Sequence, residues 1–296
     1  MAHIPVLLNE VLEIFNPQAG EAYIDATING GGHARSIAEK VGEDGAVWGI
    51  DLDCELIEKL KIKNQELGIN NINLICENYA NLADIVRQYH VDPPRGILFD
   101  LGFSFYHIAE SQRGFSFQKN EPLDMRYSPS SGGTTASDII RKGTREELEK
   151  IFCEYGEERY SGRIAEAIAE ERRRHPIETT FELIAVVRRA VPRSYEGGRI
   201  HPATRVFQAL RIAVNDEFEN IRKGIGDGFQ ALRSGGKLAV ISFHSGEDRI
   251  VKNLFRDLVK AKEGLLLIKK PITASPGEIA RNSHARSAKL RAIQKL

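Results

Sequence analysis

Cysteine is scarce in this sequence. Only three cysteines occur among 296 residues, at Cys54, Cys76 and Cys153, and none of them belongs to a Cys-x-x-Cys pair. An odd number of widely spaced cysteines argues against a disulfide framework and against a cysteine-rich zinc site, and it fits a reducing compartment. We therefore expect a cytoplasmic protein without a metal centre.

A charge excess of either sign and long apolar runs are also missing. The 41 Lys and Arg balance 41 Asp and Glu, so net charge argues neither for nor against a nucleic acid partner. No apolar stretch approaches the roughly 20 residues that span a bilayer, and the N-terminus lacks the features of a secretory signal. We expect no membrane partner. With 42% hydrophobic and 28% charged residues, the chain is predicted to be globular, with one large domain or two smaller ones.

The N-terminal part of the chain alternates between two kinds of pattern. Short apolar runs predict strands at 22–25, 46–51, 72–76 and 96–100, and the stretches at 33–41, 53–67 and 79–89 predict helices. Asp53 suits an N-cap and Gly68 a stop for the second of these helices. Strands separated by helices of this length form βαβ units, so we expect a doubly wound α/β fold with a parallel sheet.

This alternation stops near residue 107, and no convincing strand follows until about residue 205. Helical spacing over 145–173 and 180–191 predicts an all-helical insertion. The α/β pattern then resumes with one or two helices over 204–232, a strand over 237–243, a helix over 247–259, a strand over 265–268 and an antiparallel edge strand over 288–293. The predicted domains are a core in two parts, 1–106 and 206–296, and the insertion 107–205.

Residues at the ends of the predicted strands indicate a ligand site. The first strand leads into three glycines at 30–32, a turn that suits a ligand but also an ordinary connection to a helix. The dinucleotide fingerprint fails because Arg35 stands where a third small residue is needed, and no Walker A motif follows. Asp51 can accept ribose hydroxyls, and Tyr79 can stack on adenine, while Asp100 ends the fourth strand. An adenosine ligand without pyrophosphate favours S-adenosylmethionine over NAD.

Eight motifs that recur in order give the chain a wider resemblance. They are HIPVLLNE at 3–10, GGGH at 30–33, RGFSF at 113–117, PLDMR at 122–126, FQALR at 207–211, ISFHS at 241–245, EDRIVK at 247–252 and RSAKLR at 286–291. Together they resemble the bacterial methyltransferases that act on N4 of a cytosine in small-subunit (16S) ribosomal RNA, the RsmH/MraW family. The resemblance covers the whole chain.

This resemblance implies a fold, a reaction and a cofactor site. The fold is a Rossmann-like methyltransferase core with an inserted helical domain, and the reaction is S-adenosylmethionine-dependent methylation of 16S rRNA near the decoding centre. By position, the cofactor contacts fall on Gly31, Gly32, His33, Asp51, Tyr79, Asp100 and His107. The chain departs from the family pattern at Tyr79, where Phe is usual, at His107, where Gln is common, and at Gly246, where Leu is usual.

Methylation at N4 requires help from the protein, because the nitrogen lone pair is delocalised into the cytosine ring. The N4 protons need acceptors, and the nitrogen must lie in line with the methyl carbon. The candidate catalytic residues are Asp100, Ser104, Asp124 and His244. For His244, a helix cap beside Glu247 is an equally good interpretation.

Binding an RNA backbone requires cations, which the sequence concentrates in the insertion and the C-terminal tail. The candidate RNA-binding residues are Arg113, Arg126, Arg286, Lys289 and Arg291. The predicted partner is 16S rRNA or the small ribosomal subunit, and the sequence leaves monomer and homodimer open.

Two other functions remain open. One is a methyltransferase for another nucleic acid or a small molecule, although the Asn/Asp-Pro-Pro-Tyr signature of amino-group DNA methylases is absent after the fourth strand. The other is a non-catalytic RNA-binding assembly protein that retains cofactor binding, which the unusual residues Phe105, His107 and Gly246 keep open.

Overall fold

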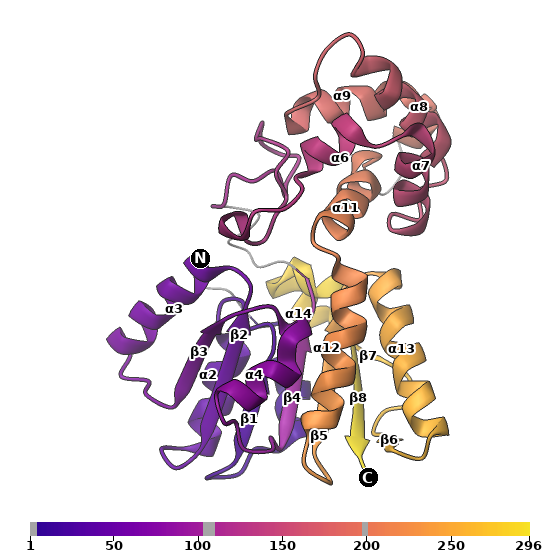
Figure 1. Cartoon of the computed structure of the whole chain (residues 1–296). Coiled ribbons are helices and arrows are strands. Elements are labelled where there is room, and N and C mark those ends of the chain that lie inside the picture. Colours follow the sequence, from indigo (N-terminus) through magenta and orange to yellow (C-terminus); the bar gives the residue numbers. More distant parts are fainter. Residues whose placement is uncertain (1–4, 103–109, 197–200) are drawn as a thin grey trace. The chain divides into compact units, whose positions relative to one another are not determined.

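The computed structural model describes residues 5–102, 110–196 and 201–296, and the chain forms two compact units (Figure 1). The first, here called the sheet unit, comprises Met1–Ser104 and Phe218–Leu296. The second, the helical unit, is Phe105–Glu217. The predicted boundary at 205 falls within α11 (Ala203–Val214), whose buried Phe207 and Leu210 belong to the core of the helical unit. The helical unit therefore continues to Glu217.

The sheet unit contains one mixed sheet with the strand order β3-β2-β1-β4-β5-β8-β6, and β7 also pairs with β8. The strands are β1 (Ala22–Asp25), β2 (Ala46–Asp51), β3 (Ile72–Cys76), β4 (Gly96–Asp100), β5 (Lys237–Ser242), β6 (Gly264–Leu266), β7 (Ile272–Thr273) and β8 (Lys289–Lys295). The pairings that join β3, β2, β1, β4 and β5 are parallel, which confirms the predicted α/β fold. The predicted edge position of β8 is wrong, because β8 lies antiparallel between β5 and β6.

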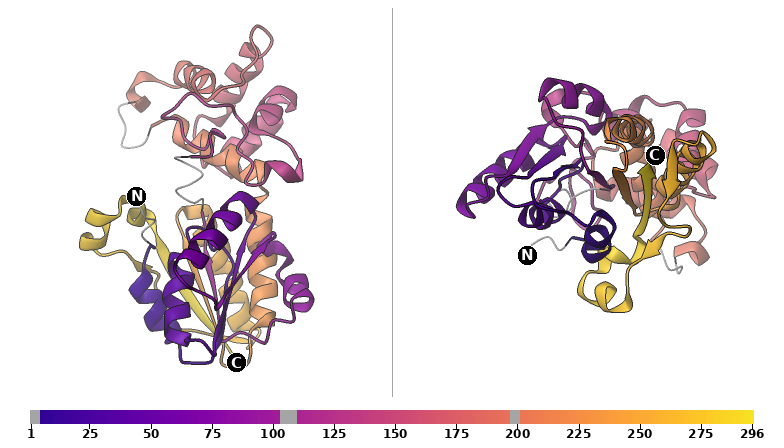
Figure 2. Two further views of the ribbon diagram at one scale, coloured as in Figure 1. Left: turned by 90° about the vertical axis from the view of Figure 1, so that its left-hand side faces the viewer. Right: turned by 90° about the horizontal axis from the view of Figure 1, so that it is seen from below.

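Helices cover both faces of this sheet (Figures 1 and 2). The helices of the sheet unit are α1 (Leu8–Phe15), α2 (Gly32–Val41), α3 (Cys54–Glu66), α4 (Leu82–Gln88), α12 (Glu217–Ala231), α13 (Ser245–Lys260) and α14 (Pro276–Arg281), with 3-10 turns at Tyr79–Asn81 and Ser283–Ser287. On one face, Phe99 packs with buried Phe229 of α12 and Phe255 of α13. On the other face, Phe15 of α1 packs on Tyr23, with 5.5 Å between the ring centroids. Apolar residues on both sides of a strand are what a buried parallel sheet requires.

The helical unit has a core of its own. Its helices are α6 (Ala136–Lys142), α7 (Arg145–Glu154), α8 (Ser161–Glu171), α9 (Thr180–Ala190), α10 (Arg193–Glu196) and α11. Leu148, Phe152 and Ile164 are fully buried in this core. The helical stretch predicted over 145–173 forms two helices, α7 and α8, with a turn near Gly156 between them. Glycine is required in this turn, because a Cβ at position 156 would lie 2.6 Å from the Arg205 carbonyl oxygen. The described residues of this unit form helices and one isolated bridge between Pro122 and Thr179.

The cysteines correct one expectation. Cys54 and Cys76 form a disulfide bond, and Cys153 is free and exposed. Cys54 opens α3 directly after β2, and Cys76 ends β3, so the β2–β3 pairing brings together two residues that are far apart in the sequence. Among the described helices, none is both long and apolar enough to cross a membrane.

Candidate active site

A ligand is expected at the carboxyl ends of β1 and β4. After β1 the chain crosses to β2 on one side, whereas β4 pairs with β1 on the other. Ligands of doubly wound sheets bind beyond the carboxyl ends of the strands at such a switch point. Six of the predicted cofactor contacts lie at or after the carboxyl ends of the four strands β1 to β4 in the sheet unit: Gly31, Gly32, His33, Asp51, Tyr79 and Asp100.

Hydrogen bonds from the turn after β1 tie three strand ends together. Thr27 Oγ1 accepts a hydrogen bond from the Asp100 backbone N–H at 2.6 Å. Asn29 donates its side-chain amide to the Asp100 carbonyl at 3.3 Å, and its backbone N–H to Asp51 Oδ2 at 3.1 Å. Gly31 then turns the chain with a φ of 71°, a conformation that glycine adopts without strain. Thr27 and Asn29 are not among the predicted site residues, although polar side chains beside a run of glycines are a usable signal in the sequence.

Asp51 is the last residue of β2, and Tyr79 opens the 3-10 turn that follows β3. The Asp51 carboxylate is half-buried and also accepts the Asp53 backbone N–H at 3.0 Å, which fixes its orientation. The Tyr79 ring meets Phe99 edge to face, with 5.6 Å between centroids. Gly224 of α12 supports the other part of the ring, because a Cβ there would lie 2.5 Å from Tyr79 Cδ2. Both side chains are therefore held in place by the sheet unit itself.

Asp100 is a buried carboxyl group with incomplete hydrogen bonding. Its Oδ1 has no hydrogen-bond partner among the described residues, and its Oδ2 lies 3.6 Å from His33 Nδ1. His33 Nε2 lies 2.9 Å from the Val6 carbonyl oxygen. Because a carbonyl oxygen only accepts, Nε2 carries the hydrogen of this bond. The other ring nitrogen, Nδ1, faces Asp100 Oδ2.

Burial and like charges raise the pKa values of two carboxyl groups at the strand ends. Burial, followed by the charges of Asp25 and Glu247, raises the pKa of Asp100 well above its usual range. Burial raises the pKa of Asp25 to about 7, and the charge of Asp51 adds to this. Burial therefore favours the protonated form of both groups, and a positively charged ligand would favour ionisation.

This donor set fits S-adenosylmethionine. The unpartnered Asp100 Oδ1 suits an ammonium group, Asp51 suits a pair of ribose hydroxyls, and the Tyr79 ring suits a base. At the start of α2, Gly31 carries no side-chain cap, so backbone N–H groups there suit a carboxylate. Arg35 lies against the glycine loop and donates to the Gly30 carbonyl oxygen at 2.8 Å.

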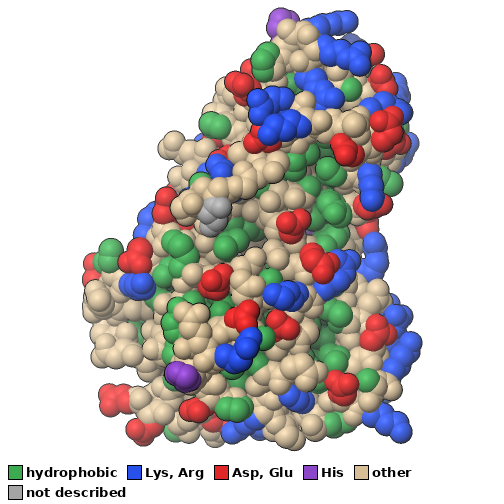
Figure 3. All heavy atoms as spheres, in the orientation of Figure 1, with side chains coloured by type: hydrophobic (Ala, Val, Ile, Leu, Met, Phe, Trp, Pro, Cys, Tyr) green, Lys and Arg blue, Asp and Glu red, His purple; other side chains and the backbone are tan. Residues whose placement is uncertain are grey.

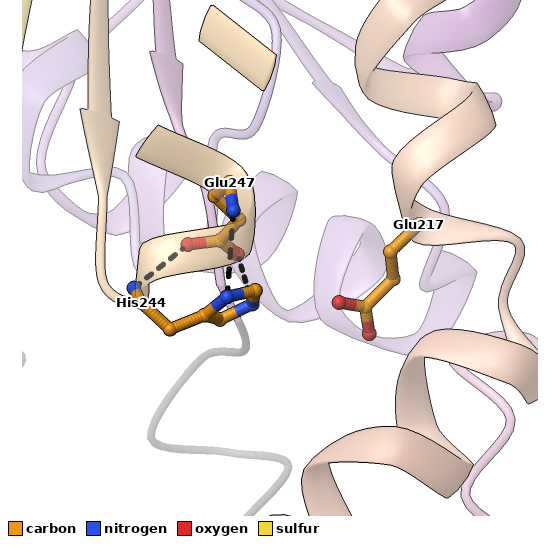
Figure 4. Close-up of side chains that lie close together, drawn as sticks. All are labelled: Glu217, His244 and Glu247. Atoms are coloured by element: carbon orange, nitrogen blue, oxygen red, sulfur yellow. Dashed lines mark hydrogen bonds and ion pairs between the residues drawn. The ribbon is translucent and has the colours of Figure 1, made fainter. Parts of the chain in front are cut away.

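His244 is a helix cap. Its Nδ1 accepts the Glu247 backbone N–H at 3.4 Å, while Glu247 Oε2 accepts the backbone N–H groups of Phe243 and His244 (Figure 4). His244 Nε2 lies 3.2 Å from Glu247 Oε1 without hydrogen-bond geometry. Glycine at position 246, where the family usually has Leu, leaves room for Phe218, because a Cβ there would lie 2.6 Å from Phe218 Cζ. The catalytic role of His244 stays a prediction. Glu247, whose carboxylate completes this cap, is 1% exposed.

Asp124, Arg126 and Arg113 all lie in the helical unit. Arg126 donates to both Asp124 carboxylate oxygens at 2.7 Å. Burial raises the pKa of Asp124, but the hydrogen bonds from Arg126 outweigh burial and hold the pKa below its usual range. Arg113 is 8% exposed and donates to the Tyr127 carbonyl oxygen at 2.9 Å. The proposed catalytic and RNA-binding roles of these residues stay predictions.

The predicted RNA-binding residues of the tail differ in their surroundings. Arg291 donates to Asp248 Oδ1 at 2.7 Å, and Lys289 lies 3.3 Å from Asp248 Oδ2, so both link β8 to α13. Arg286 is exposed. Ser104 and His107, the remaining predicted site residues, and Phe105 lie outside the described residues.

Comparisons with known proteins agree with this geometry. A model of the MraW methylase family matches residues 1–296. The chain is 45% identical over 309 residues to a protein of Syntrophotalea carbinolica named ribosomal RNA small subunit methyltransferase H, with 99% of this chain and 98% of that protein covered. A protein of the same name from Persephonella marina is 44% identical over 294 residues, with 99% of each chain covered. These matches confirm the family resemblance found in the sequence.

Proposed function

Because the chain belongs to the MraW methylase family, we propose that it transfers a methyl group from S-adenosylmethionine to RNA of the small ribosomal subunit. We infer that the acceptor is the exocyclic N4 of a cytosine in 16S rRNA, near the decoding centre, and that the reaction takes place in the cytoplasm. The observation that carries the proposal is the 45% identity to a small-subunit rRNA methyltransferase over almost the whole chain, together with cofactor-binding side chains at the strand ends.

In this proposal the sheet unit holds the cofactor. Asp51 accepts the ribose hydroxyls, the Tyr79 ring contacts the base, and Asp100 Oδ1 accepts the ammonium group. Bound S-adenosylmethionine supplies an electrophilic methyl group on a positively charged sulfur. Its positive charges lower the pKa of the buried Asp100 carboxyl, so binding of the cofactor favours the ionised form.

The chain must also accept a proton from N4. His244 Nδ1 already accepts the Glu247 backbone N–H while it caps α13, so the lone pair of that nitrogen is occupied. Asp124 is paired with Arg126. We therefore propose that Asp100 is the group that orients the reacting partners, with Ser104, Asp124 and His244 as candidate acceptors in the substrate complex.

We propose that the helical unit and the tail bind rRNA. Lys and Arg side chains gather over the surface of the helical unit, with acidic side chains between them (Figure 3). Arg173, Arg174 and Arg193 are exposed there, and Arg286 is exposed in the tail. The target cytosine must be unpaired or leave its stack to reach a pocket at the strand ends.

A methyl-transfer assay with labelled S-adenosylmethionine tests the function. We expect label in small ribosomal subunits or 16S rRNA and none in duplex DNA, and mass spectrometry of the nucleosides should give N4-methylated cytidine. Label in DNA would support the alternative methyltransferase, and cofactor binding without transfer would support the assembly protein.

The variant Asp51→Ala tests the site. Loss of the ribose contacts should weaken cofactor binding by at least about tenfold, as expected when one or more hydrogen bonds to a charged group are lost. Asp44→Ala is the matched control, because Asp44 is exposed in the turn that precedes the same strand, β2. Isothermal titration calorimetry with S-adenosylhomocysteine measures both. Wild-type affinity in Asp51→Ala would overturn the assignment of the site.

A further inference from the structure

We propose that Glu278 is a positioning residue for the cofactor site, because it holds residues 5–7 against the glycine loop at 30–32. We call residues 5–7 the strap. This inference rests on the proposed binding of S-adenosylmethionine at the ends of β1 and β4.

Three contacts hold the strap. A Cβ on Gly32 would lie 3.0 Å from Pro5 Cδ, so the strap packs directly on the glycine loop. The Val6 carbonyl oxygen accepts the hydrogen of His33 Nε2 at 2.9 Å. Glu278 Oε1 accepts the Leu7 backbone N–H at 2.7 Å, across 271 positions of sequence. Two of these contacts are therefore made to cofactor-loop residues, and the third is made to the C-terminal tail.

The backbone of the strap depends on this support. Leu7 has φ 54° and ψ 34°, the left-handed conformation that a leucine adopts only at a cost in free energy. Its side chain is fully buried, and no side chain caps α1 at this position. A buried backbone N–H needs an acceptor, and a carboxylate forms a stronger hydrogen bond than a neutral acceptor. The hydrogen bond to Glu278 therefore offsets part of the free-energy cost of the left-handed conformation at Leu7.

Glu278 is itself held by the structure of the tail. It lies on α14, and its backbone N–H donates to Ser275 Oγ, the cap of that helix, at 3.2 Å. The segment that follows α14 leads through the turn at Ser283–Ser287 into β8. Figure 2 shows part of the yellow C-terminal segment beside the indigo N-terminal segment, and the Leu7–Glu278 hydrogen bond joins these two segments at the strap.

The strap acts on the cofactor site through His33. The Val6 carbonyl fixes which His33 nitrogen carries the hydrogen, and Nδ1 then faces Asp100 Oδ2. If the bond from Leu7 to Glu278 is lost, the strap relaxes, and His33 and Gly32 lose their packing partner. We expect weaker cofactor binding with little change in the rate at saturating cofactor, because Glu278 touches neither the cofactor nor the acceptor.

The test compares Glu278→Ala, Glu278→Gln and Arg281→Ala in the full chain. Arg281 is an exposed residue of the same helix and serves as the control. Titration calorimetry with S-adenosylhomocysteine should show binding about tenfold weaker in Glu278→Ala, which is the size expected for one charge-assisted hydrogen bond. Glu278→Gln, whose amide oxygen still accepts, should recover most of the affinity, and Arg281→Ala should bind like wild type. In the methyl-transfer assay, Glu278→Ala should raise KM for S-adenosylmethionine and leave kcat within about twofold.

Hydrogen exchange at the Leu7 amide, measured without ligand, tests the strap directly. We expect faster exchange in Glu278→Ala than in wild type, with Glu278→Gln between them. If wild type binds the ligand and Glu278→Ala binds it equally well, the positioning role is overturned and the proposed function stands. If wild type does not bind the ligand, both are overturned. Unchanged exchange at Leu7 in Glu278→Ala would also overturn the positioning role, even if that variant is destabilised.

Discussion

At the scale of single residues, the buried carboxyl groups at the strand ends set the chemistry of the sheet unit. Asp25 is 1% exposed and Asp100 is 5% exposed. The unfolded chain ionises such groups near their ordinary pKa, whereas burial raises their pKa in the folded protein. Burial of these carboxyl groups therefore lowers the free energy of unfolding at pH values where the unfolded chain ionises them.

We predict that the free energy of unfolding depends on pH through Asp25, and that the variant Asp25→Asn removes this part of the dependence. The pKa of Asp25 is about 7 when folded and 3.8 when unfolded, so the folded state holds an extra proton between these values. The free energy of unfolding therefore falls as pH rises from 3.8 to about 7, by at most about 1.4 kcal/mol per pH unit for this group. In Asp25→Asn this contribution is absent, so the variant gains stability relative to wild type as pH rises.

The measurement is urea unfolding followed by the fluorescence of Trp48, the single tryptophan, which lies in β2 and reports on the sheet unit. Asp44→Asn, at an exposed site, is the control and should follow wild type at every pH. Equal pH dependence in wild type and Asp25→Asn would contradict the prediction.

At the scale of elements, the tail combines an exposed segment with a strand inside the sheet. β8 pairs with β5 on one side and β6 on the other, and Arg291 joins it to Asp248 of α13. Burial raises the pKa of Asp248, but the hydrogen bonds and charges of Arg291 and Lys289 together outweigh burial and keep the pKa below its usual range. Arg286 and Arg291 belong to one motif, but Arg286 is exposed, whereas Arg291 is paired with Asp248.

We predict that Arg286→Ala and Arg291→Ala have different effects. Arg286→Ala should weaken binding to 16S rRNA and lower the salt slope of that binding by about one, because one phosphate contact is lost. Arg291→Ala should mainly lower the free energy of unfolding, by about 1–3 kcal/mol, because it leaves Asp248 with fewer partners. Filter binding over a salt series and thermal unfolding measure the two effects. An unchanged salt slope in Arg286→Ala would argue against the RNA contact.

At the scale of the whole molecule, one unit is continuous in sequence and the other is not. The helical unit is a single segment, Phe105–Glu217, with its own buried core. Arg211 and Glu217 form a buried ion pair inside it, and the Tyr127 hydroxyl donates to Glu217 at 3.0 Å. The sheet unit is assembled from both ends of the chain.

We therefore predict that a fragment of residues 105–217 folds by itself, with a helical circular dichroism spectrum and a cooperative thermal transition. A fragment of residues 105–205 is the matched control. It lacks Phe207 and Leu210 of the core as well as the Arg211–Glu217 pair, so it should lose the cooperative transition. Equal behaviour of both fragments would show that α11 is not part of this unit's core.

The sequence alone determined the features that depend on neighbouring residues. The strands at 22–25, 46–51, 72–76 and 96–100 have the predicted bounds. Asp53 caps α3 by accepting the N–H groups of Glu55 and Leu56, and Gly68 follows that helix with a φ of 67°. Periodicity and capping are local effects of backbone sterics and short-range hydrogen bonds, so they can be read from the chain. The motifs likewise revealed the family.

The tertiary structure alone decided which distant residues meet. The spacing of the cysteines argued against the Cys54–Cys76 bond. The sequence pattern also predicted that β8 lies at an edge of the sheet and that the insertion ends at residue 205, which lies within α11. Nothing near Leu7 in sequence pointed to Glu278. Each of these contacts depends on how strands pair and helices pack across the core, where many arrangements satisfy the same local pattern and only the packed whole selects one.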